Sequence, residues 1–86
     1  MNTKVLNRAF YGKGLGRMAK GTVTWFSEQK GYGFISPNDG GESIFVHYTD
    51  IVGSGFRSLK VGEIVSYVPA RGPRGNIVAR TVYRAE

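Results

Sequence analysis

Apolar and polar residues alternate over short segments from Lys20 to Tyr83, and this alternation is typical of β-strands. No stretch of ten or more residues there repeats its apolar positions with the 3.6-residue period of a helix. The pattern therefore predicts an all-β fold. The expected strands cover Gly21–Ser27, Tyr32–Ser36, Ser43–His47, Ile64–Ala70 and Ile77–Tyr83.

Turn-forming residues separate the expected strands. Residues 38–41, Asn-Asp-Gly-Gly, contain the Asp-Gly pair that is typical of a hairpin, and residues 71–76 hold two glycines and a proline. The longer connection, residues 48–63, has room for one helical turn at Thr49–Val52 before the glycines of residues 53–55 break it. Five short strands with one long connection fit a small barrel, which hides the edges of its sheet.

Strict alternation gives each of the two middle strands one aliphatic and one aromatic face. The aliphatic residues are Ile35, Ile44 and Val46; the aromatic residues are Tyr32, Phe34, Phe45 and His47. A small barrel has a single interior, which branched aliphatic side chains fill well, so we expect the rings outside. The alternative is that the rings are simply core, because Phe is usually buried. The alternation favours an exposed aromatic patch, and such a patch marks an interaction site.

The first expected strand does not alternate cleanly. Trp25 has the same parity as Val23, so strict alternation would place both on one face. Either a bulge near Thr24 resets the register or Trp25 is partly buried. Phe26 is equally ambiguous.

Aromatic residues gather in the middle of the chain, where six of the eleven lie between positions 25 and 48. Lys20 and Lys30 bracket the first strand. Rings beside cations suit single-stranded nucleic acid, since each base can stack on a ring for roughly 1–3 kcal/mol while lysine meets the phosphates. Gly31 and Gly33 stand beside the rings, and one hypothesis is that they keep this platform clear for a base. The alternative is that they only permit a bulge or a tight entry.

Charge adds a second indication of the partner. The 86 residues suffice for one small domain, and 12 Lys and Arg against six acids give a net charge of +6, which favours polyanionic partners. Residues 1–17 hold four of the bases and no acid, whereas residues 18–86 carry eight bases against six acids. Stacking should therefore contribute more than bulk charge to the affinity of the domain.

Residues 1–17 differ in composition from the rest, with glycine at positions 12, 14 and 16. We interpret them as a flexible basic N-terminal extension, because these glycines oppose any regular element. An amphipathic targeting helix is the alternative, but the glycines would interrupt it. Binding to a membrane surface would need a long apolar face that this segment lacks.

Several function classes lack the residues they need. The chain has no cysteine and a single histidine, His47, so neither a disulfide scaffold nor a metal site is expected. The six acids are scattered without paired spacing, which argues against an enzyme and favours a stacking role for His47 over that of a general base. No apolar run reaches the 18 or so residues of a membrane span, and no secretory signal is evident. We expect a cytoplasmic protein with no cofactor and no small-molecule substrate.

Five motifs together resemble a bacterial cold-shock domain. They are Gly21–Phe26 (GTVTWF), Lys30–Ile35 (KGYGFI), Ile44–Tyr48 (IFVHY), Gly55–Leu59 (GFRSL) and Arg74-Gly75, in the order and approximate spacing of that family. KGYGF alone also resembles a motif of the RNA-recognition motif domain. That domain continues with Val-x-aromatic, where this chain has residues 35–37, Ile-Ser-Pro, and it needs two helices that the pattern does not show.

The resemblance implies a five-stranded antiparallel OB-fold barrel over residues 18–86 that binds single-stranded RNA and DNA. It also implies the role of an RNA chaperone or a regulator of transcription and translation. The binding residues expected on this basis are Lys20, Trp25, Phe26, Lys30, Tyr32, Phe34, Phe45, His47, Tyr48, Phe56, Arg57 and Arg74. Thr24 and Ser27 replace a lysine and an asparagine that are usual in the family, which removes two polar contacts. A monomer is expected, and a strand-swapped dimer remains possible. An OB-fold module that docks on a protein or the ribosome is the alternative function.

Overall fold

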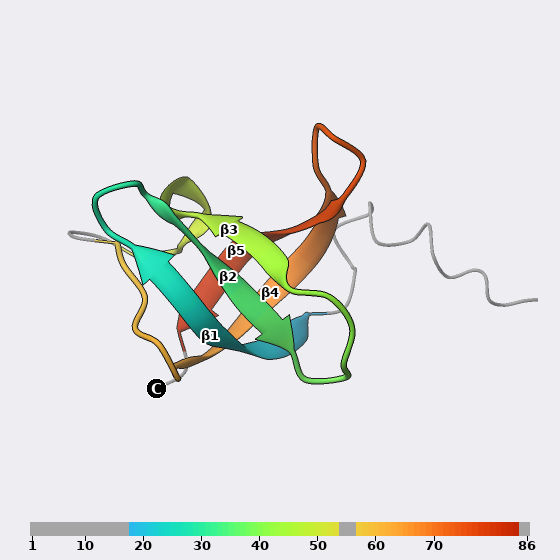
Figure 1. The fold of residues 1–86 in the computed structure, drawn as a ribbon, viewed down its shortest axis with the longest axis horizontal. Helices are drawn as coiled ribbons and strands as arrows, with labels where there is room; N and C mark the ends of the chain where they lie inside the picture. Colours follow the sequence, from blue (N-terminus) through green and yellow to red (C-terminus); the bar gives the residue numbers. More distant parts are fainter. Residues whose placement is uncertain (1–17, 54–56, 85–86) are drawn as a thin grey trace, which may run out of the picture.

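Five strands close into a barrel in a computed structural model that describes residues 18–53 and 57–84 (Figure 1). The strands are β1 (Ala19–Ser27), β2 (Tyr32–Pro37), β3 (Ile44–His47), β4 (Ile64–Arg71) and β5 (Ile77–Arg84), and a 3-10 helix, η3 (Tyr48–Asp50), follows β3. The all-β prediction is confirmed, and each strand bound lies within two residues of its expected place. The helical turn begins one residue before the expected Thr49.

The strand order around the barrel is β1-β2-β3-β5-β4. The pairs β1–β2, β1–β4, β2–β3 and β4–β5 are antiparallel, but β3 and β5 run parallel, with Phe45 opposite Val78 and Val46 opposite Ala79. The expectation of an entirely antiparallel barrel is therefore wrong at this one seam. The long connection after β3 carries the chain to the far side of β1, so β5 returns beside β3 in the same direction (Figure 1).

A bulge in β1 decides where Trp25 points. The β1–β2 register shifts between Val23 and Trp25. Trp25 therefore lies opposite Phe34, whereas an unbroken register would place it opposite Gly33. Val23 is 1% exposed in the core, whereas Trp25 is 42% exposed on the outside. The bulge that the sequence offered as one of two explanations is thus the one that the structure shows.

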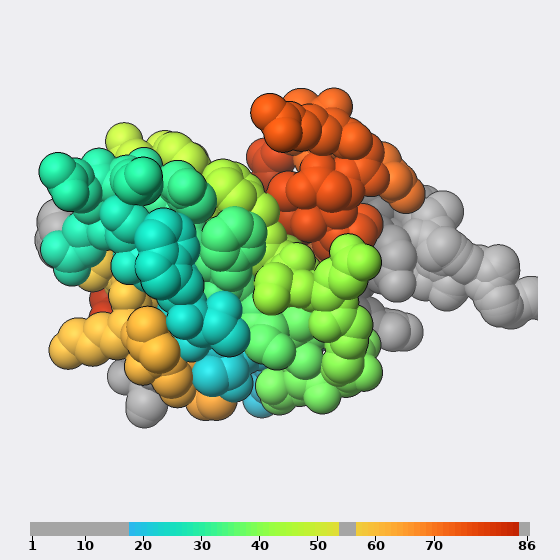
Figure 2. Space-filling model, in the orientation of Figure 1, coloured from blue at the N-terminus to red at the C-terminus, as the bar shows by residue number. Residues whose placement is uncertain are grey.

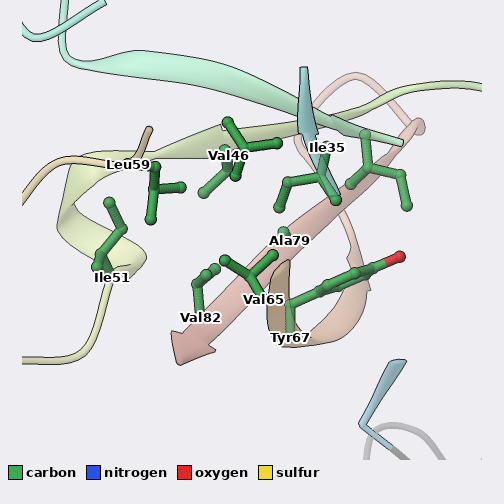
Figure 3. Packing of buried hydrophobic residues seen from close by; sticks show 10 residues of the cluster. Ile35, Val46, Ile51, Leu59, Val65, Tyr67, Ala79 and Val82 are labelled. Atoms are coloured by element: carbon green, nitrogen blue, oxygen red, sulfur yellow. The ribbon is translucent and has the colours of Figure 1, made fainter. Parts of the chain in front are cut away.

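Branched aliphatic side chains from all five strands and from the connection after β3 fill the interior (Figure 3). The buried cluster consists of Val23, Ile35, Ile44, Val46, Ile51, Leu59, Val65, Tyr67, Ala79 and Val82. Tyr67 is the largest of them, and burial, together with the negative charge of Asp39, raises the pKa of its hydroxyl. The predicted division between an aliphatic inner face and an aromatic outer face is confirmed for β2 and β3.

An ion pair fastens the end of β5 to the residue before β4. Arg84 Nε donates to Glu63 Oε2 at 2.8 Å, and the Lys60 N–H donates to Glu63 Oε1 at 2.9 Å. Burial alone would raise the pKa of Glu63, but these two hydrogen bonds and the nearby positive charges hold it below its usual value.

Across residues 18–53 and 57–84, no helix has the length and apolar character that crossing a bilayer requires.

Candidate nucleic-acid interface

Six rings form a continuous row on the outside of β1, β2, β3 and η3, and we name this row the aromatic face. It consists of Trp25, Tyr32, Phe34, Phe45, His47 and Tyr48. Each ring centroid lies between 4.8 and 6.5 Å from that of a neighbour. The rings therefore pack against one another, some stacked and some edge to face.

Strand register explains why these rings meet. Directly opposite residues on neighbouring strands share a face, and Phe34 of β2 lies opposite both Trp25 of β1 and Phe45 of β3. Tyr32 lies opposite His47 in the same way. The closest parallel pair is Tyr32 and Phe45, whose centroids are 5.3 Å apart at an interplanar angle of 26°.

Solvent reaches all six rings. Trp25 and Tyr48 are 42% and 44% exposed, and the other four are half-buried. An apolar surface of this extent, rimmed by polar residues, is the kind that binds a partner. Rings held by their neighbours lose little side-chain freedom when a flat partner stacks on them, and this lowers the entropic cost of binding.

His47 is oriented by the turn that follows it. Its Nδ1 accepts a hydrogen bond from the Thr49 backbone N–H at 3.3 Å and lies 2.9 Å from Thr49 Oγ1. Because a backbone N–H can only donate, the proton of the neutral ring lies on Nε2. His47 thus caps η3 through one nitrogen and keeps an N–H donor on the other.

Gly33 faces the interior and not the aromatic face. It alternates with Tyr32 and Phe34 and is buried, and a Cβ there would collide with the Trp25 carbonyl oxygen and lie 2.6 Å from Phe26 Cδ1. The hypothesis that Gly33 clears the platform for a base is therefore wrong. Its lack of a side chain instead makes room for the β1 bulge that turns Trp25 outward.

Gly31 serves the turn before β2. Its φ is +83°, a value that favours glycine, and its N–H donates to the Ser27 carbonyl at 2.7 Å. Its carbonyl accepts from the Tyr48 N–H at 2.9 Å, and a Cβ would lie 2.9 Å from Tyr48 Cδ2. Gly31 thus lets the Tyr48 ring approach the turn closely.

A hollow of about 450 Å³ adjoins the aromatic face at the β1–β2 turn. Its lining includes Phe26 and Tyr48 as an apolar wall, the cations Lys30 and Arg57 from distant parts of the chain, and one carboxylate, Glu28. Phe26 also packs against the core, which explains why its alternation was ambiguous. Phe56 lies outside the described residues.

Two expected residues lie outside the row of rings. Lys20 is exposed near the start of β1, where it pairs with Ser66 of β4, and it precedes Trp25 by five residues, roughly 16 Å along a strand. Arg74 lies in the turn between β4 and β5. Of the twelve expected residues, the structure therefore brings nine together around the aromatic face and its hollow.

A five-stranded barrel with aromatic residues on an outer face is the architecture of an OB-fold that binds nucleic acid. The family model described as the "'Cold-shock' DNA-binding domain" matches residues 19–84. The chain therefore belongs to the cold-shock domain family, a family of nucleic-acid-binding proteins.

Curated relatives agree with this assignment. The chain is 52% identical over 59 residues to the cold shock-like protein CspD of Escherichia coli strain K12. The aligned segment covers 69% of this chain and 80% of that protein. It is 50% identical over 58 residues to the probable cold shock protein A of Mycolicibacterium smegmatis, with 67% of this chain and 87% of that protein covered. It is 55% identical over 64 residues to glycine-rich protein 2 of Nicotiana sylvestris, with 74% of this chain covered but only 30% of that longer protein.

Among solved structures, the barrel is similar to "drosophila Unr CSD456", with a TM-score of 0.70 at 14% identity. The match covers 92% of this chain and 31% of that one. At this identity the likeness concerns the fold alone, and it supports the OB-type barrel.

Proposed function

We propose that this protein binds single-stranded RNA and DNA by stacking unpaired bases on the aromatic face. The observation that carries the proposal is the unbroken row of six outward rings across β1, β2, β3 and η3. A stacked base contributes roughly 1–3 kcal/mol whatever its sequence, because every base has a π-face. Lys30 and Arg57 beside the hollow, with Phe26 as its apolar wall, are suited to the backbone and to one further base.

Preference for single strands follows from the chemistry of stacking. In a duplex, the faces of the bases are already covered by neighbouring bases, so the rings have nothing to stack on. A protein that binds only the open state shifts the equilibrium towards it by RT ln(1 + [L]/Kd), about 2.7 kcal/mol at a hundredfold excess over Kd. That suffices to open weak hairpins without ATP, and we infer that the protein acts as an RNA chaperone or a regulator of transcription and translation.

In this proposal the protein is a cytoplasmic binding module and not an enzyme, with no cofactor, small-molecule substrate or membrane as partner. His47 serves as a stacking ring with an Nε2–H donor, since Thr49 already engages its Nδ1. Residues 18–86 form the binding domain, and residues 1–17 add a basic extension. The domain acts as a monomer.

The test is a titration of the protein with short unstructured oligonucleotides. The fluorescence of Trp25, the single tryptophan, monitors binding. We expect quenching with micromolar or tighter affinity, and little quenching by a duplex of the same sequence. Tyr83→Ala is a matched control, because Tyr83 is an exposed ring, 46% accessible, on β5 outside the aromatic face. If single strands do not quench Trp25, the proposal is wrong and the aromatic face is better interpreted as a protein-docking surface.

A further inference from the structure

Positive charge in the barrel is concentrated on β4, β5 and the turn between them. Residues 18–63 contain four basic and five acidic residues, whereas residues 64–84, which form β4, β5 and their turn, contain four arginines and no acid. The arginines are Arg71, Arg74, Arg80 and Arg84, and all four are exposed. A phosphodiester backbone attracted to the barrel should therefore be drawn towards β4 and β5.

The parallel seam places this arginine-bearing region beside the aromatic face. Val78 of β5 lies opposite Phe45 of β3, and both point outward, since their neighbours Ala79 and Val46 belong to the core. Val78 is nevertheless only 7% exposed, because the β4–β5 turn covers it, and a Cβ on Gly72 would lie 2.8 Å from its Cγ1. The turn thus stands at the edge of the aromatic face, next to β3 (Figure 2).

Hydrogen bonds within the turn hold Arg74 in place. The Gly72 N–H donates to the Asn76 carbonyl at 2.7 Å, and the Gly75 N–H donates to the Gly72 carbonyl at 3.0 Å. Arg71 Nη1 donates to the Gly75 carbonyl at 2.6 Å, so this guanidinium also holds the turn together. Arg74, between these anchored residues, is presented to solvent at the top of the turn.

Arg80 follows Val78 by two residues on the outward face of β5, where it pairs with Val68 of β4. The register of β5 shifts directly after it, and Thr81 takes a φ of +49°, which returns Val82 to the core. Arg84, further along the strand, is already bound to Glu63 at 2.8 Å. Arg74 and Arg80 are therefore the guanidinium groups best placed to meet a ligand that leaves the aromatic face at Phe45.

Arg74 is among the binding residues that the family resemblance implies, whereas Arg80 is not. We propose that Arg80 joins Arg74 in a phosphate-binding extension of the interface. A single strand whose bases stack on the aromatic face passes Phe45 and crosses β5, where its backbone phosphates meet these two guanidinium groups. Arginine suits this task because its planar fork matches the oxygens of a phosphate. This inference rests on the proposed function, and it adds nucleotides to the binding site beyond those that the rings hold.

Salt dependence tests the extension in the full-length chain. We compare wild type with the double variant Arg74→Gln/Arg80→Gln on two homopolymeric DNA strands, one of about 6 and one of about 15 nucleotides, lengths within the usual range for one OB-fold. Each phosphate contact to a single strand contributes about −0.7 to the slope of log K against log salt, so two lost contacts flatten the slope by about 1.4. Between 50 and 200 mM salt, wild type should lose about sevenfold more affinity for the long strand than the variant loses.

The short strand should show nearly the same slope for both proteins, because the rings alone can hold it. Lys60→Gln is the matched control, since Lys60 is an exposed base in the connection before β4, outside both surfaces, and it should leave both slopes unchanged. Thermal melting checks that each variant is folded. Trp25 quenching by the short strand reports separately on the proposed function.

Two results would overturn the extension while leaving the proposed function intact. One is an unchanged slope for the long strand in the double variant. The other is a stoichiometry of two short strands per protein, the second lost in the double variant, which would make Arg74 and Arg80 a separate site. If wild type shows no quenching with either strand, the proposed function itself fails.

Discussion

Strands β1–β3 and strands β4–β5 present two different outer surfaces on one barrel. The first three strands and η3 carry six rings and, over residues 18–63, one more acid than bases, while the last two strands and the turn between them carry four arginines and no acid. Inside the barrel the two regions are alike, since both contribute branched aliphatic residues to one core. The difference shows that a small barrel can separate contact by stacking, which acts at short range and tolerates salt, from attraction by charge, which salt screens.

The sharpest way to examine the first region is to compare two neighbours on β2. Ile35→Ala should lower the free energy of unfolding by about 2–5 kcal/mol, because the side chain is fully buried. Phe34→Ala, one residue away and outward, should lower it by less than about 1 kcal/mol. Chemical denaturation of both variants measures the difference. An equal, large loss for Phe34→Ala would mean that this ring belongs to the core.

For the affinity for a single strand, in contrast to stability, the outward rings should be the residues that matter most. Phe34→Ala and Phe45→Ala each remove a stacking partner and should weaken binding of a short single strand by about 1–3 kcal/mol, or roughly 5- to 150-fold. Tyr83→Ala, an exposed ring in the second region, should change the affinity less than twofold. Fluorescence or anisotropy titration measures all three. Similar losses for Tyr83→Ala and Phe45→Ala would contradict the assignment of stacking to the aromatic face.

Residues 1–17 add four bases and no acid to the chain, so they offer a second source of charge beside β4 and β5. If they contact phosphates, their deletion should flatten the slope of log K against log salt by up to about 2.8, at 0.7 for each contact. The measurement is a salt series with a long single strand on the full-length and the shortened chain. An unchanged slope would leave the arginines of β4 and β5 as the main charged contacts.

The smallest expected effect concerns the ion pair between Arg84 at the end of β5 and Glu63 before β4. In the folded protein the pKa of Glu63 lies below 4.5, the value of the unfolded chain. The ionised carboxylate therefore stabilises the fold at pH values above 4.5, and this stabilisation is lost as the pH falls through the lower pKa of the folded state. Because Arg84 is 39% exposed, the pair contributes under about 1 kcal/mol. Glu63→Gln should lose that increment at pH 7 and show a weaker decline in stability below pH 4.5. Urea unfolding at pH 7 and in acid checks this, and an identical acid profile in both proteins would count against it.

Local sequence was enough to find the strands, because the two-residue period of a strand is a property of the backbone itself. The same period assigned Ile35 to the interior and Phe34 to the outside, and it marked Trp25 as a break in the pattern, for which a bulge was one of two explanations. Motif resemblance supplied the candidate site, and the family it indicated is the one to which the chain belongs.

The way in which the barrel closes decided which strands and side chains became neighbours. No local pattern tells that β5 joins β3 in parallel, because that pairing depends on how residues 48–63 carry the chain across the barrel. Only this seam brings Val78, and with it Arg80, to the edge of the rings. Likewise, alternation alone turns Gly33 inward, but the reason that glycine is needed there is the Trp25 carbonyl on the neighbouring strand, a contact that parity does not reveal. The sequence by itself determined which side chains each strand turns outward, whereas the tertiary structure decided which of those side chains became neighbours.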